Sequence, residues 1–416
     1  MEKISQVFGI GTHHCERCAN NPGSCMKAVV WEGAKSVKVE HVPKPEILEP
    51  QDAIIEVTAC SVSPDFAAQA YAGEAEGMQK GQILGSEAVG VVHKIGSQVS
   101  SLSPGDRVAI SFVIACGQCS HCKRQEFSAC NCTNESLGFK KSFGGWAPAA
   151  VFGSTQMFNN VAGSQAEFVR VPFAEVNCFK IPRGVPDEKA VYAGETAVCG
   201  LYATELANVA QGSTVVIWGL GPVGLMAATW SKLKGAKKVI GIDHNNERLT
   251  FARDRLHIDV VDRTKLSCSE VIVKLQEKLP EAGADCVIDA SGTARGAGMV
   301  AKVQSSMGME PAPIDTFKEI FTTVRKFGHI GVISSYVDFV DAYPIGHAVL
   351  KNLTVRNGRC PAQKYIKQVL GAIESGELDP SMLTSHHMNL DELAKSYGEI
   401  GHEGGGYLKV VVCPQK

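Results

Sequence analysis

A chain of 416 residues, of which 44% are hydrophobic and 20% charged, has the length and composition of a soluble globular protein with two domains. The formal net charge of -2 excludes the strongly basic surface that nucleic acid or an anionic membrane would require. No apolar run is long enough to cross a bilayer, and the N-terminus lacks the basic start and apolar core of a secretory signal. We therefore expect a cytoplasmic protein that acts on a small molecule, without nucleic acid or membrane partners.

The chain begins with a polar extension, residues 1–25, which is followed by a β-rich half. Cysteines and histidines in the extension could form a small zinc site, although a disordered or loosely docked tail is the simpler interpretation. From Met26 onward, short runs alternate or are continuously apolar, and prolines separate them, which indicates a small irregular β-barrel. The expected strands are 27–31, 36–40, 52–59, 88–95 and 105–110.

Fifteen cysteines are many for a cytoplasmic protein, in which disulfides are rare, and their clustering indicates a metal site. One polar segment carries a Cys-x-x-Cys-x-x-Cys spacing, with a fourth cysteine shortly after it. Four thiolates at this density can close a tetrahedral site for one structural Zn²⁺, with no position left for a substrate. We assign His121 and Cys132 as bystanders. The predicted zinc ligands are Cys116, Cys119, Cys122 and Cys130.

Residues 213–243 predict a dinucleotide-binding unit. An apolar strand enters a Gly-x-Gly-x-x-Gly turn, an apolar helix follows, and a second strand ends at Asp243, about 20 residues after the last glycine. Gly219 permits the tight turn, Gly221 lets the backbone approach a pyrophosphate, and Gly224 lets the helix pack closely. Because Asp243 would accept both ribose hydroxyls and repel a 2′-phosphate, we predict NAD rather than NADP. The other predicted dinucleotide contacts are Leu220, Pro222, Val223, Arg248 and Arg356.

Strands and helices alternate from about residue 200 onward, and this alternation predicts a doubly wound parallel sheet. The last part of the chain, with a helix, a loop through His386 and His387, a further helix and a closing strand 407–412, should return to the β-rich half. The expected helices of the alternating part are 246–255 and 267–279, and its later strands are 258–261, 285–289, 327–333 and 353–355.

This arrangement resembles the medium-chain dehydrogenase/reductase superfamily, and within it the glutathione-independent formaldehyde dehydrogenase branch. The similarity covers nearly everything from Met26 to the end, including residues 163–172, 181–190, 285–292 and 351–356. It implies an α/β fold with a GroES-like catalytic domain and a Rossmann coenzyme domain, an NAD(P)-dependent oxidoreductase, and a homodimer or homotetramer built through the coenzyme domain. The expected domains are 1–25, the extension; 26–199, catalytic with the Cys₄ lobe; 200–350, Rossmann; and 351–416, the return to the catalytic domain.

In that family three side chains hold a catalytic zinc, and this chain departs from the pattern at all three positions. The cysteine ligand corresponds to Ser63, the histidine of Gly-His-Glu corresponds to Ser86, and the third ligand corresponds to Glu195. The segment that begins at Ser63 also resembles the Asn-Pro-x-Asp segment of zinc-independent enoyl and quinone reductases. Serine hydroxyls are poor zinc ligands, so we predict that the catalytic zinc is absent.

Hydride transfer without this zinc would need an electron-poor substrate, such as an enone, enal, iminium ion or quinone methide, together with a proton source. Two carboxylates in one poorly solvated site disfavour double ionisation, so one of them would keep a proton. Alternatively, Glu87 pairs with an arginine such as Arg356 and only holds the site together. The candidate catalytic residues are Glu195, Glu87, Ser63, Ser86 and Asp65.

Two other functions remain open. A working zinc dehydrogenase could use the unusual ligand set Cys60, Glu87 and Glu195, and a non-redox lyase, cyclase or binding protein could use the same fold. The intact dinucleotide fingerprint argues against a pure scaffold. By analogy with other divergent sites, we expect the substrate to be a specialised metabolite.

Overall fold

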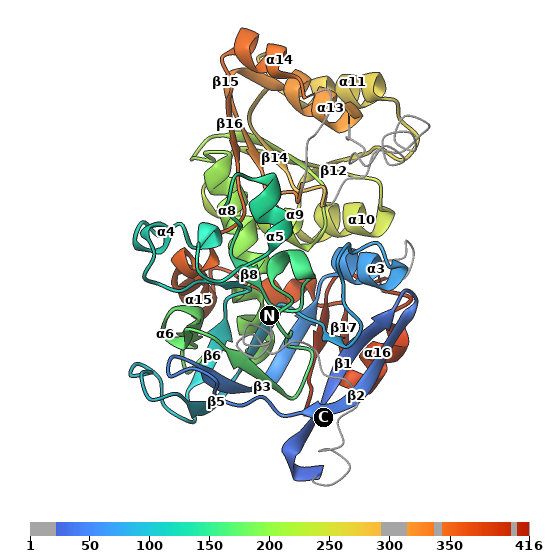
Figure 1. Cartoon of the computed structure of the whole chain (residues 1–416). Coiled ribbons are helices and arrows are strands. Elements are labelled where there is room, and N and C mark those ends of the chain that lie inside the picture. Colours follow the sequence, from blue (N-terminus) through green and yellow to red (C-terminus); the bar gives the residue numbers. More distant parts are fainter. Residues whose placement is uncertain (1–21, 293–313, 337–342, 401–405, 416) are drawn as a thin grey trace. The chain divides into compact units, whose positions relative to one another are not determined.

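The computed structural model describes residues 22–292, 314–336, 343–400 and 406–415 (Figure 1). The chain divides into two compact units, the first formed by Met1–Val198 with Pro361–Lys416 and the second by Cys199–Cys360. Residues 1–21 of the expected extension lie outside the described residues. Cys25 is disulfide-bonded, which the assignment of the cysteines to metal did not anticipate, and the other described cysteines are free thiols. Among the described helices, none combines the length and the hydropathy needed to cross a membrane.

The first unit is built around β3 (Ala53–Val62), which lies inside a seven-stranded sheet with the order β10-β6-β5-β3-β18-β17 and also pairs with β9. A three-stranded sheet has the order β2-β1-β4, and β7 pairs with β8. The other strands are β1 (Cys25–Gly33), β2 (Ser36–Pro43), β4 (Gln82–Ile83), β5 (Glu87–Ile95), β6 (Arg107–Ile110), β7 (Val113–Ile114), β8 (Ala150–Val151), β9 (Phe168–Val171), β10 (Cys178–Lys180), β17 (His386–Met388) and β18 (Val410–Val412).

Short helices connect these strands, and the core of the unit is apolar. Most residues of β3 are buried, and Ile55 and Val57 lie in that core. The expected loop through His386 and His387 is wrong, because these residues form β17, which pairs in parallel with β18. The helices are α3 (Pro64–Ala72), α4 (Ser120–Lys123), α5 (Leu137–Ser142), α6 (Ala174–Asn177), α7 (Asp187–Ala190), α15 (Ile366–Glu374) and α16 (Leu390–Ser396), and α8 (Thr196–Leu206) runs into the second unit.

The second unit contains a six-stranded sheet with the order β13-β12-β11-β14-β15-β16, and all five pairings are parallel. Counted along the chain, this is the order 3-2-1-4-5-6 of a dinucleotide-binding sheet, which confirms the predicted doubly wound fold. The unit extends to Cys360 rather than to residue 350 because β16 pairs with β15. The elements are β11 (Thr214–Trp218), α9 (Pro222–Leu233), β12 (Lys238–Asp243), α10 (Asn246–Arg255), β13 (Asp259–Asp262), α11 (Cys268–Lys278), β14 (Ala284–Asp289), α13 (Ile314–Thr323), β15 (Val324–Val332), α14 (Ile345–Lys351) and β16 (Thr354–Asn357).

Candidate functional site

The glycine turn between β11 and α9 has no room for side chains. Gly219 has a φ of +87°, and a Cβ there would lie 2.4 Å from the carbonyl oxygen of Ala290. A Cβ on Gly224 would lie 1.9 Å from the carbonyl oxygen of Gly219. Helix α9 begins with Pro222, which has no N–H to leave unsatisfied at the first helical position, and Gly221 is its N-cap. This turn therefore presents the backbone N–H groups at the start of α9 in the geometry that suits a pyrophosphate.

Asp243, at the end of β12, stabilises this turn through hydrogen bonds. One carboxylate oxygen accepts the N–H of Leu220 at 2.6 Å, and the other accepts the N–H groups of His244 at 2.7 Å and Asn245 at 2.9 Å. Since a carboxylate has about four acceptor positions and three are used, Asp243 still has capacity for about one ribose hydroxyl. The turn and this acid fit a bound dinucleotide.

Two further predicted contacts lie elsewhere in the second unit. Arg248 is in the first turns of α10, the helix that follows Asp243. Arg356, on β16, is exposed and donates to the carbonyl oxygen of Glu205 at 3.0 Å.

Glu87, a predicted catalytic residue, and Lys409, which was not predicted, are deeply buried charges, 1% and 0% exposed. Lys409 Nζ lies 2.8 Å from Glu87 Oε2, and the ion pair joins the start of β5 to the residue before β18. The idea that Glu87 pairs with Arg356 is therefore wrong, since Lys409 is its partner. A buried ion pair of this kind is tolerated only when both charges are well hydrogen-bonded.

Glu87 meets that condition. Oε1 accepts the N–H groups of Thr196 at 2.6 Å and Glu195 at 3.1 Å, which are otherwise unsatisfied at the start of α8. Oε2 accepts the hydroxyls of Thr196, at 2.9 Å, and of Ser61, in addition to the ammonium. Both oxygens are thus fully used, and Glu87 could bind a metal ion only by giving up these partners.

The three positions that correspond to the family's catalytic zinc ligands surround this pair. Lys409 Nζ donates to Ser63 Oγ at 2.9 Å, and Ser63, the N-cap of α3, makes no capping bond with its side chain. Ser86 Oγ donates to Glu195 Oε2 at 2.5 Å. Asp65, in the first turn of α3, is exposed. We call the connected side chains the Lys409 network; its members are Ser61, Ser63, Ser86, Glu87, Glu195, Thr196 and Lys409.

This donor set does not fit a catalytic zinc. An ammonium ion contacts Ser63, the position of the family's cysteine ligand, and Glu87, and a second cation beside it would be repelled. The alternative ligand Cys60 is fully buried in the core of the unit, and burial raises the pKa of its thiol. Neighbouring residues of a strand point to opposite faces. Because Ser61 faces Glu87, Cys60 faces away from it, and the set Cys60, Glu87 and Glu195 is not assembled.

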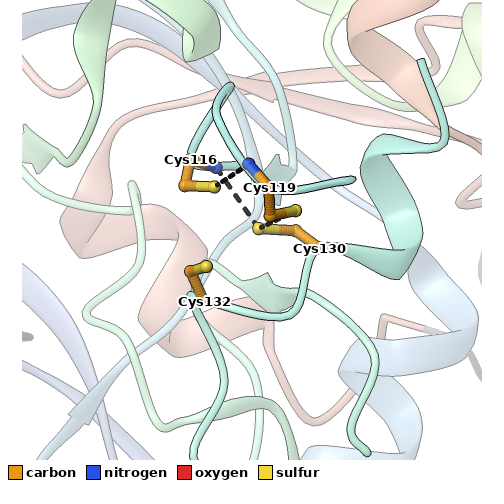
Figure 2. Close-up of side chains that lie close together, drawn as sticks. All are labelled: Cys116, Cys119, Cys130 and Cys132. Atoms are coloured by element: carbon orange, nitrogen blue, oxygen red, sulfur yellow. Dashed lines mark hydrogen bonds between the residues drawn. The ribbon is translucent and has the colours of Figure 1, made fainter. Parts of the chain in front are cut away.

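The cysteine segment forms a compact sulfur cluster in the first unit. The Sγ atoms of Cys116, Cys119, Cys130 and Cys132 lie within 4.8 Å of one another (Figure 2). Cys122, which the sequence pattern includes, has its Sγ 3.9 Å from that of Cys116. Sulfur atoms bound to one tetrahedral Zn²⁺ at about 2.3 Å are separated by about 3.8 Å. The cluster therefore fits a zinc ion.

The cluster differs from the expected ligand set because Cys132, taken as a bystander, contributes a thiol to the group. The other assigned bystander, His121, has its Nδ1 2.8 Å from a carboxylate oxygen of Glu126.

Sequence reasoning missed three members of the Lys409 network: Ser61, Thr196 and Lys409. Lys409 carries no clear signal, because a lysine directly before a strand such as Val410–Val412 is ordinarily exposed and its partner Glu87 is distant in the sequence. Ser61 and Thr196 carry none either, since hydroxyl residues are frequent in strands and at helix starts.

Comparison with known proteins agrees with this architecture. The family model described as "Alcohol dehydrogenase GroES-like domain" matches residues 49–183, and the one described as "Zinc-binding dehydrogenase" matches 222–309. A zinc-type alcohol dehydrogenase-like protein of Schizosaccharomyces pombe is 41% identical, over 93% of this chain and 91% of its own length. A glutathione-independent formaldehyde dehydrogenase of Pseudomonas aeruginosa is 31% identical, over 93% of this chain and 97% of its own length. Among solved structures, the alcohol dehydrogenase TADH from Thermus sp. ATN1 has 29% identity and a TM-score of 0.76, over 93% of this chain and 99% of its own.

Proposed function

We propose that this chain, which belongs to the zinc-type alcohol dehydrogenase-like medium-chain dehydrogenase/reductase superfamily, transfers hydride without a catalytic zinc. Membership of the superfamily makes the chain an oxidoreductase with a nicotinamide cofactor. The observation that carries the proposal is the position of Lys409, whose buried ammonium contacts both Ser63 and Glu87. A fixed positive charge, rather than a metal ion, is available where the family stabilises developing negative charge.

The substrate class follows from what a hydroxyl and an ammonium can do. A zinc ion polarises a plain carbonyl strongly, whereas hydrogen-bond donors contribute less. We therefore propose a substrate that is already electron-poor, namely a conjugated carbonyl of a specialised metabolite, because the buried charge of Lys409 would repel an iminium ion. The dihydronicotinamide, when bound, supplies the hydride. NAD rather than NADP is favoured because the carboxylate of Asp243 would repel a 2′-phosphate.

The residues of the first unit would supply hydrogen bonds and a proton. The Lys409 ammonium donates to Ser63 Oγ, and a hydroxyl that accepts from an ammonium is itself a stronger donor. Ser63 can thus direct its hydroxyl hydrogen at a substrate oxygen that gains negative charge. Ser86 and Glu195 form a second donor pair, and the half-buried Glu195 would hold the proton that completes the reduction.

We propose in addition one structural Zn²⁺ in the sulfur cluster. It would stabilise the segment that carries the thiols and would leave no ligand position for a substrate. This zinc takes no part in hydride transfer.

Glu195→Gln tests the role of the proton donor. We expect the variant to fold and to bind NADH, but its turnover of an enal substrate should fall by about 100-fold or more, because general acid catalysis contributes 10²–10⁴-fold. The measurement is NADH oxidation together with product formation in equal amounts. The exposed Glu377→Gln is the matched control and should keep the wild-type rate. Unchanged turnover in Glu195→Gln would remove Glu195 from the mechanism, and product without NADH oxidation would point to a non-redox reaction.

A further inference from the structure

The sulfur cluster contains one thiol more than a tetrahedral zinc ion needs. Four of the thiols, of Cys116, Cys119, Cys130 and Cys132, lie within 4.8 Å of one another, and Figure 2 shows their Sγ atoms gathered together. The fifth, Cys122, has its Sγ 3.9 Å from Cys116 Sγ. Structural zinc sites are closed by four ligands. Five thiols therefore compete for four positions.

We propose that Cys122 and Cys132 are interchangeable fourth ligands of the structural zinc, with the thiolates of Cys116, Cys119 and Cys130 common to both ligand sets. This inference rests on the structural zinc that forms part of the proposed function. In the exchange one Zn–S bond forms as another breaks, and the proton lost by the incoming thiol is balanced by protonation of the departing thiolate.

The distances place each candidate beside at least one of the common thiols. Cys116 and Cys122 are separated by 3.9 Å, and Cys119 and Cys130 by 4.0 Å, measured between Sγ atoms. Both values are close to the separation of about 3.8 Å between two sulfur ligands of one zinc ion. The Sγ atom of Cys132 lies within 4.8 Å of the Sγ atoms of the three common thiols, which is a looser limit than this separation.

The regular structure around the two exchanging thiols is also short, so the backbone there can move. Cys122 lies in α4, which has 4 residues, and Cys132 lies in a turn. Such elements have few internal hydrogen bonds to break, so a small rotation can bring either thiol to the ion.

The two candidates differ in exposure. Cys122 is only 3% exposed, whereas Cys132 is exposed to solvent. When Cys122 binds the ion, Cys132 is a free surface thiol. An alkylating or oxidising reagent could then modify Cys132 without releasing the zinc. The second ligand would protect the metal site against loss of the first.

The test compares the variants Cys122→Ser, Cys132→Ser and the double variant, with Cys268→Ser, a partly exposed cysteine of the second unit, as control. Zinc per chain is measured first, and then the rate of zinc release to a chromogenic chelator. We expect both single variants to keep one zinc and to release it nearly as slowly as the wild type. The double variant should release it at least about 10-fold faster, since even outer-sphere changes cost 10–100-fold in metal affinity.

A single variant as labile as the double variant would overturn the proposal, because only one of the two cysteines would then be a ligand. A double variant as slow as the wild type would overturn it as well. A wild type without zinc would instead contradict the structural zinc itself.

A second measurement needs no variant. Zinc-loaded protein is treated with iodoacetamide, and the alkylated cysteines are mapped by mass spectrometry. Chains alkylated at Cys132 should keep their zinc and an unmodified Cys122, and loss of zinc from these chains would contradict the exchange.

Discussion

Glu87 receives hydrogen bonds on both carboxylate oxygens and keeps its counter-ion, Lys409, inside the first unit. Such a pair is costly to bury and more costly to break, because removal of one partner leaves an unpaired charge. The structural and catalytic roles of Lys409 can therefore be separated by experiment.

We predict that Lys409→Met lowers the free energy of unfolding of the first unit by about 3–5 kcal/mol, the usual cost of leaving one buried charge unpaired. The further change Glu87→Gln should restore much of this loss, and the refolded double variant should remain inactive because Ser63 has lost its ammonium partner. Urea unfolding and turnover are the measurements. Lys189→Met is the control, since Lys189 pairs with Asp379 at the surface, where such a pair contributes about 1 kcal/mol or less. Equal losses in Lys189→Met and Lys409→Met would contradict the importance of the buried pair.

At the level of residues, the sequence predicted Ser63, Ser86 and Glu195 as site residues but did not indicate which side chain lies among them. Departure from a family pattern can be read position by position, and that is how these three were identified. Lys409 was missed because its partner is far away in the sequence and only the fold brings the two together.

At the level of elements, β11, α9 and β12 form the predicted dinucleotide-binding unit, and together they span 214–243, close to the predicted 213–243. The agreement has a physical cause, since a fully buried strand and a glycine turn leave strong local signals. Strand β17 was missed for the opposite reason. His386 and His387 have no β pattern of their own, and pairing with β18 makes them a strand.

Gly224→Ala tests this element. The added Cβ would lie 1.9 Å from the carbonyl oxygen of Gly219, so α9 must shift away from the turn. We expect NADH to bind at least about 10-fold more weakly, which corresponds to about 1.4 kcal/mol. Gly371→Ala in α15 is the control, because a Cβ there meets nothing within 4 Å. It should keep wild-type NADH affinity and be slightly more stable. Calorimetric titration with NADH would contradict the expectation if both variants bound equally well.

At the level of the whole molecule, each unit has its own apolar core, which is why the division into two parts was visible in the sequence. Several exposed apolar residues lie together on one helix of the second unit. Helix α14 exposes Ile345, Val349 and Leu350, and β16, with β15 as its neighbour, ends the order of the parallel sheet. We propose that these surfaces join two copies of the chain through the second unit, because a strand at the edge of the described sheet and an apolar helix face invite association.

Leu350→Glu should then shift the protein toward the monomer, as measured by light scattering after size-exclusion chromatography. The control is Leu137→Glu in α5, because Leu137 and Leu350 are both 81% exposed. A mass unchanged by Leu350→Glu, or equally changed by Leu137→Glu, would contradict an interface at α14.

The central claim, that Lys409 stands in place of a catalytic zinc, is tested most directly by counting zinc. The measurement is elemental analysis of zinc per folded chain after purification without added metal, for the wild type and for Cys116→Ser/Cys130→Ser. We predict one zinc in the wild type and none in the variant, because the sulfur cluster would hold the only zinc. Two zinc ions in the wild type, or one that remains in the variant, would contradict the claim, and Glu87 and Glu195 would then become candidate ligands.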